Sequence, residues 1–186
     1  MISVHTAKNI GAVLLSGVPV ALGSVVGRYA ASDSSGASDA SRDGWYEGLD
    51  KPAYTPPSLA FSVVWPVLYV LMGLAAFLAY AWGRRPILIV YGALFFNLAF
   101  NLAFPLVQFR LRNLFWAMVI VWATLVTALL LTYALTVGPA KSPSKTVVHI
   151  LLLPYVLWLV FASVLSTDIY VRNRGKNGSE TLAISS

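Results

Sequence analysis

The chain of 186 residues is 58% hydrophobic and only 11% charged, whereas an average soluble domain carries roughly 25% charged residues. This small number of charged residues cannot cover a water-facing surface, and the composition therefore excludes a soluble protein. It predicts an all-α integral membrane protein. The formal charge of +6 comes from 13 Lys and Arg scattered between apolar runs, which indicates membrane lipid as a partner and argues against nucleic acid.

The first predicted membrane span covers about residues 10–29. A cleavable signal peptide is the alternative, because Ala30-Ala31-Ser32 could serve as a cleavage site. We favour a span, since the apolar run is about long enough to cross the bilayer. A connecting loop over residues 31–58 follows, and its prolines Pro52, Pro56 and Pro57 exclude a regular helix in its second half.

Four further apolar runs follow, and each is long enough to cross a bilayer as a helix. They predict membrane-spanning helices over about 59–82, 87–109, 114–137 and 146–170. The turns between them are short, so neighbouring helices are expected to run antiparallel. Residues 1–176 are therefore expected to form one five-transmembrane-helix bundle, and residues 177–186 a polar C-terminal tail.

Two amides lie at membrane depth in the third predicted span. Asn97 and Asn101 are four residues apart and therefore share one helix face. An unsatisfied amide is costly in lipid, so this face is expected to point into the bundle. The pair could line a cavity or could only join helices, and the spacing favours neither.

Aromatic residues lie inside the second and fifth predicted spans. Trp65 and Tyr69 share one face, as do Trp158 and Ala162. Two such faces could form flat walls around a large planar ligand, but a close-packed aromatic core would give the same pattern. The residues alone favour the close-packed core.

Catalytic and metal-binding patterns are not found. The chain has no cysteine, and no cluster of His or carboxylate residues has the spacing of metal ligands. We therefore expect no catalytic residue, no metal site and no required cofactor. Asp168, at the end of the fifth span, is expected to pair with Arg172 or to reach the membrane surface.

Three motifs follow one another in the second half of the loop and in the spans. They read Trp45-Tyr46-x-x-Leu49-x-Lys51-Pro52-x-x-x-Pro56-Pro57 with Phe61, Trp65, Leu68-Tyr69 and Gly73, then Asn101-x-x-Phe104-Pro105-x-x-Gln108-Phe109, then Pro154-Tyr155-x-x-Trp158-x-x-Phe161-Ala162-x-x-Leu165. Together they resemble the TspO/MBR family, which includes tryptophan-rich sensory proteins and translocator proteins, the former peripheral-type benzodiazepine receptors. Phe104, Gln108 and Ser166 depart from residues that many members share, which leaves the ligand preference open.

The resemblance implies a five-helix bundle, often a homodimer, with a ligand pocket beneath the first loop. The family's ligands are porphyrin-type tetrapyrroles such as protoporphyrin IX and haem, sterols, and isoquinoline or benzodiazepine-like compounds. By position, the resemblance assigns the lid to Lys51, Pro52, Pro56 and Pro57, and the ligand contacts to Tyr46, Trp65, Tyr69, Asn97, Asn101, Trp158 and Ala162.

The family resemblance leaves the activity open between a receptor or stress sensor, a transporter and a photo-oxidative porphyrin-degrading enzyme. In the enzyme, Trp65 and Trp158 would take part in the reaction. Leu165, Tyr170 and Arg172 match the family's loose sterol-binding pattern. We expect a multi-pass protein of a prokaryotic cell membrane, with the mitochondrial outer membrane as the alternative.

Overall fold

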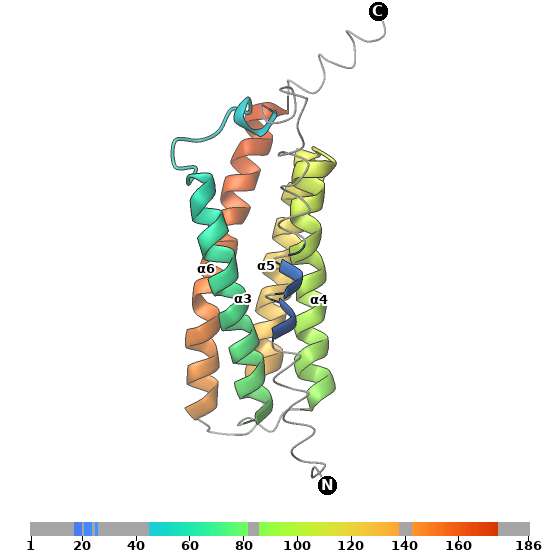
Figure 1. Ribbon diagram of the computed structural model, residues 1–186, viewed down its shortest axis with the longest axis vertical. Helices are drawn as coiled ribbons and strands as arrows, with labels where there is room; N and C mark the ends of the chain where they lie inside the picture. The colour runs from blue at the N-terminus through green and yellow to red at the C-terminus, as the bar shows by residue number, and fades with distance from the viewer. Residues whose placement is uncertain are drawn as a thin grey trace, which may run out of the picture.

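The computed structural model describes residues 17–19, 21–23, 25, 45–81, 86–137 and 143–174. Long helices account for most of these residues and run side by side as a bundle (Figure 1). They are α3 (Ser58–Ala81), α4 (Ile87–Pro105), the π-helix η1 (Leu106–Arg110), α5 (Leu114–Thr136) and α6 (Pro143–Asn173).

Four stretches of the described residues are long and apolar enough to cross a membrane. They cover Leu59–Ala81, Ile87–Arg110, Leu114–Thr136 and Lys145–Asn173. The last four predicted spans are therefore confirmed, although α6 extends past the predicted end at residue 170. The predicted first span lies largely outside the described residues, as do residues 31–44 and the tail 177–186.

The bundle is apolar outside as well as inside. Helix α5 packs closely against both α4 and α6, and α3 packs mainly against α6. Large apolar side chains nevertheless remain exposed on every long helix, among them Val67, Leu88, Leu129 and Val160. Such an exterior is stable only in lipid, so the exposed apolar faces and the hydropathy of the helices indicate the same environment.

The π-helix after Pro105 is the one irregular stretch within the described spans. Proline has no N–H to donate to the preceding turn, and its ring crowds the carbonyl four residues back. The chain widens there, and the N–H of Leu111 donates to the Leu106 carbonyl at 3.1 Å. Arg112 then adopts a left-handed conformation with φ of 50°. This turn brings α5 back antiparallel to α4.

Candidate functional site

A chain of hydrogen bonds between side chains joins three helices in the middle of the bundle. The Tyr69 hydroxyl of α3 donates to Oδ1 of Asn101 at 3.0 Å, and Nδ2 of Asn101 donates to the Tyr155 hydroxyl at 2.8 Å. The Tyr155 hydroxyl of α6 in turn donates to Oδ1 of Asn97 at 2.7 Å. Both asparagines lie on α4, so this helix is the centre of the network.

Asn97 carries the network on to the fourth helix, α5. Its Nδ2 donates to Oγ1 of Thr127 at 2.8 Å and to the Thr124 carbonyl at 3.1 Å. The exposed fractions of Asn97 and Asn101 are 0% and 3%, so water does not compete for these bonds. Both asparagines face the interior as predicted, and the protein itself binds their amides. This arrangement favours a role in joining helices.

Aromatic rings fill the space between α3 and α6. We call these rings the aromatic cluster; they belong to Tyr54, Phe61, Trp65, Tyr69, Trp158 and Phe161. Trp65 stacks on Tyr69, with ring centroids 5.7 Å apart and planes inclined by 28°. Trp65 also meets Trp158 edge to face at 6.5 Å and 89°. The two indoles face one another as expected, but they touch, so a planar molecule enters between them only if one ring moves.

The aromatic cluster continues from Trp158 toward the end of the bundle where α6 ends. Trp158 contacts Phe61 and Phe161, each with ring centroids 5.5 Å apart. Phe161 in turn meets Tyr54 of the preceding loop at 6.3 Å. Ala162, one turn beyond Trp158 on the same helix, is half-buried.

Trp158 carries a buried polar atom that no other described residue satisfies. Its indole Nε1 has no hydrogen-bond partner among the described residues. Leaving a buried donor unpaired costs about 1–3 kcal/mol, so such a group requires an explanation. An acceptor oxygen on a molecule within the aromatic cluster would satisfy it. Gln108 Oε1 and Ser163 Oγ are also buried without a partner, but no ring contact links them to the cluster.

The loop residues 45–57, which we call the lid, lie over the end of the bundle (Figure 1). Lys51 Nζ pairs with Glu47 at 2.8 Å and lies 4.6 Å from the centre of the Tyr46 ring. Both contacts stay within the lid. The lid prolines differ in burial, with Pro52 buried, Pro56 half-buried and Pro57 exposed.

Tyr46 belongs to the lid and lies against η1, which follows α4. Its ring meets Phe109 of η1 edge to face, with centroids 5.5 Å apart. Burial raises the pKa of its phenol above 10, and the charge of Glu47 adds to the increase. Tyr46 therefore remains neutral and packs as a ring against Phe109, which is not one of the rings of the aromatic cluster.

The residues of the sterol-binding pattern make two kinds of contact. Leu165 is buried, in a small core with Leu114 and Ile169. Tyr170 packs against Phe115 of α5 with centroids 5.7 Å apart. Arg172 instead pairs with Asp168, with Nε donating to Oδ1 at 2.7 Å, as expected for these two residues. Leu165 and Tyr170 thus pack at the same small core, Arg172 takes part in a polar contact, and a role of the three in sterol binding stays a prediction.

Three residues with structural roles were not identified from the sequence. Tyr155 holds both amides of α4, Tyr54 reaches α6 from the lid, and Asn173 contacts the lid from the last turn of α6. Tyr155 lies in the same motif as Trp158, which was a usable signal. Asn173 follows the apolar run, and no pattern in the sequence marks it.

The fold and the site together define a multi-pass α-helical membrane protein whose helices surround an aromatic cluster beneath a loop. The chain belongs to the TspO/MBR family, whose model matches residues 15–172. Members of this family are five-helix transmembrane proteins, so the predicted fold class and the predicted resemblance are both confirmed.

Similar proteins occur in bacteria, archaea and animals. The chain is 37% identical over 130 residues to the tryptophan-rich protein TspO of Bacillus cereus, covering 69% of this chain and 80% of the relative. It is 33% identical over 129 residues to the protein of the same name in Archaeoglobus fulgidus, with the same coverage of 69% and 80%. It is 30% identical over 142 residues to the human translocator protein, covering 74% and 80%.

Proposed function

We propose that this protein is a membrane receptor that binds a planar tetrapyrrole, such as protoporphyrin IX or haem, at the aromatic cluster beneath the lid. The buried, unpaired Nε1 of Trp158 carries the proposal, because this N–H offers a hydrogen bond to a guest inside a set of aromatic rings. Porphyrins present large flat faces for stacking and carboxylate oxygens that accept hydrogen bonds. Both features match this site.

Binding on this proposal includes a rearrangement of rings. Trp65 and Trp158 touch edge to face at 6.5 Å, so the guest replaces one of these ring contacts with its own larger face. Trp65 keeps its stacked partner Tyr69, whose hydroxyl is held by Asn101. The Trp158 ring has no such hydrogen bond to the part of the chain that the structure describes, and we therefore assign the movement to this ring.

Stacking, and not iron ligation, is the proposed source of affinity. Haem iron takes only one or two axial ligands from the protein, usually His, Cys or Met and less often Tyr. The aromatic cluster contains no His, Cys or Met, and the hydroxyls of its tyrosines Tyr69 and Tyr54 already donate to Asn101 and Asp168. His149 lies near the start of α6, at the end of the bundle opposite the lid, and its Nδ1 is 2.8 Å from the Lys145 carbonyl oxygen. Haem and metal-free protoporphyrin IX are therefore expected to bind with similar affinity.

Titration of the purified protein with protoporphyrin IX, followed by tryptophan fluorescence, tests the proposal. We expect saturable quenching that reaches one porphyrin per chain and is reversed by an excess of a competing porphyrin. Quenching that rises linearly, without saturation or competition, would mean partition into the detergent micelle and would refute the proposal.

Two alternative activities, porphyrin degradation and transport, would use the same site, and each predicts its own experimental result. A porphyrin-degrading enzyme would yield a new product under illumination, and substitution of Trp65 or Trp158 would abolish it. A transporter of porphyrin or sterol would carry its ligand across reconstituted vesicles faster than passive leakage. Isoquinoline or benzodiazepine-like compounds would compete with protoporphyrin IX if they share the aromatic cluster.

A further inference from the structure

We infer that Asn173 fastens the lid to the last turn of α6 and so sets how fast ligands enter and leave the aromatic cluster. The attachment itself is independent of any ligand. Its effect on ligand exchange depends on the binding function proposed above. Asn173 is a positioning residue in this inference, because its side chain bonds Asp50 of the lid and Ile169 of α6, neither of which belongs to the aromatic cluster.

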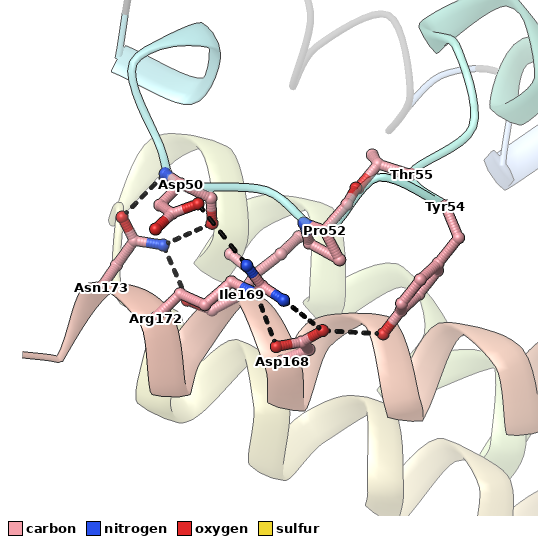
Figure 2. A network of polar contacts seen from close by, with 8 residues as sticks. All are labelled: Asp50, Pro52, Tyr54, Thr55, Asp168, Ile169, Arg172 and Asn173. Carbon is pink, nitrogen blue, oxygen red and sulfur yellow. Dashed lines mark hydrogen bonds and ion pairs between the residues drawn. The ribbon is translucent and has the colours of Figure 1, made fainter.

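The Asn173 side chain both accepts a hydrogen bond from the lid backbone and donates one to it (Figure 2). Its Oδ1 accepts a hydrogen bond from the Asp50 N–H at 3.0 Å, and its Nδ2 donates to the Asp50 carbonyl at 2.9 Å. The same Nδ2 donates to the Ile169 carbonyl of its own helix at 2.8 Å. The side chain is only 1% exposed, so the lid and the helix end enclose it.

The chemistry of a primary amide explains why asparagine suits this position. An amide offers one acceptor and one donor group in a plane, which matches the N–H and C=O of a single residue. Its second donor satisfies the Ile169 carbonyl in the last turn of α6, where backbone carbonyls lack helical partners. Removing the side chain would take a partner from the Ile169 carbonyl in a buried contact and from the N–H and C=O of Asp50 in a partly buried one, which is costly.

Side chains at the exposed edge of this contact reinforce the attachment (Figure 2). The Tyr54 hydroxyl donates to Oδ2 of Asp168 at 3.0 Å, and Arg172 Nη1 lies 3.8 Å from the Asp50 carboxylate. Exposed ion pairs contribute little to stability, because water and salt screen them. Among the polar contacts between the lid and α6, we therefore assign the largest contribution to Asn173.

The other end of the lid is attached to the α4–α5 side by ring contacts. Arg112 lies over the Trp45 ring at 5.7 Å, and Tyr46 meets Phe109. These contacts can slide, because they lack the strict direction of hydrogen bonds. The lid therefore crosses the end of the bundle with a directional attachment at α6 and a more adjustable one at α4–α5.

Release at α6 would uncover the aromatic cluster. The Tyr54 ring belongs to the lid and lies on Phe161, which lies on Trp158. When the lid leaves α6, Tyr54 leaves with it, and this side of the cluster becomes accessible. A ligand that reaches Trp158 from this end of the bundle must pass the attachment made by Asn173.

The test compares Asn173→Ala with the wild-type chain and with Glu47→Gln. The control removes the charge that pairs with Lys51 inside the lid and leaves the contact with α6 intact. Amide hydrogen exchange over residues 45–57 measures the attachment directly, because the Asp50 N–H is one of the hydrogen-bond donors in it. Stopped-flow mixing with protoporphyrin IX measures the rates of ligand binding and release. Amide hydrogen exchange over α5 confirms that the bundle is folded.

We expect Asn173→Ala to speed exchange in the lid about tenfold, the factor expected when hydrogen bonds of this kind are lost. Porphyrin association and dissociation should both become several-fold faster, while Glu47→Gln resembles the wild type in both measurements. Unchanged lid exchange in Asn173→Ala would overturn the attachment. Faster lid exchange with unchanged porphyrin rates would overturn its control of ligand exchange. If the wild type binds no porphyrin, the proposed function fails, and lid exchange alone decides on the attachment.

Discussion

Gly23 of the first predicted span lies so close to the Tyr69 ring of α3 that a Cβ atom added at residue 23 would overlap that ring. The same ring stacks on Trp65, and its hydroxyl donates to Asn101. Tyr69 is thus held from several sides at once. Only glycine permits this approach, since any larger side chain would push the ring away from its partners.

Gly23→Ala should therefore destabilise the protein. Overpacking of a close contact typically costs about 1–3 kcal/mol, more than the gain in helix propensity from alanine. Gly92→Ala is the matched control, because a Cβ added on α4 at that position meets nothing within 4 Å. Thermal unfolding in detergent should show a lower midpoint for Gly23→Ala only. Equal midpoints for the two variants would contradict the close approach.

Asn97→Leu should loosen the bundle. The leucine fills a similar volume but leaves the Tyr155 hydroxyl without its acceptor and Thr127 without the amide donor. We expect a loss of about 1–2 kcal/mol in unfolding free energy, within the range for interhelical hydrogen bonds in membranes. Thr132→Val is the control, since the Thr132 hydroxyl donates to the Ala128 carbonyl of its own helix and to no other helix that the structure describes. Stability of Asn97→Leu equal to that control would show that the network contributes nothing.

The Tyr54 phenol should ionise only at a pH above the ordinary 10. Its pKa is raised by desolvation and by the hydrogen bond that it donates to the Asp168 carboxylate. Only the protonated phenol can donate, so the contact is complete below pH 10 and is lost as the pH rises through the raised pKa. Its neighbours are the charged groups Asp168, Arg172 and Asp50.

Ultraviolet difference titration of the tyrosinate signal checks this shift. Subtracting the curve of Tyr54→Phe from that of the wild type isolates a single phenol. Its midpoint should lie above 10 and should fall toward 10 in Asp168→Asn, which removes the carboxylate charge. A midpoint at the ordinary value in the wild type would show that Tyr54 does not contact Asp168.

The helices could be predicted from the sequence because long apolar runs in this chain have few structural alternatives. The inward direction of Asn97 and Asn101 also followed from their spacing. Their partner Tyr155 did not, because it depends on how α4 and α6 are rotated relative to one another. Periodicity within one helix carries no information about that rotation.

The end of α6 could not be predicted from the sequence, for a second reason. The apolar run fades near residue 170, but the helix continues to Asn173. Asn173 and Arg172 there contact the lid, more than a hundred residues earlier in the chain. Contacts with the lid hold this polar turn, and hydropathy does not report them. The contact between Trp65 and Trp158 was likewise beyond reach, since it depends on ring rotamers.

The most direct test of the proposed site compares the protoporphyrin IX affinity of Trp158→Phe with that of Trp116→Phe. Trp158 lies within the aromatic cluster, whereas Trp116 lies on the outer face of α5 and is 55% exposed. Trp158→Phe should weaken binding at least about tenfold, because the site loses both stacking area and the indole N–H. Trp116→Phe should bind as the wild type does. Equal affinities in all three proteins would place any bound porphyrin elsewhere and would contradict this account.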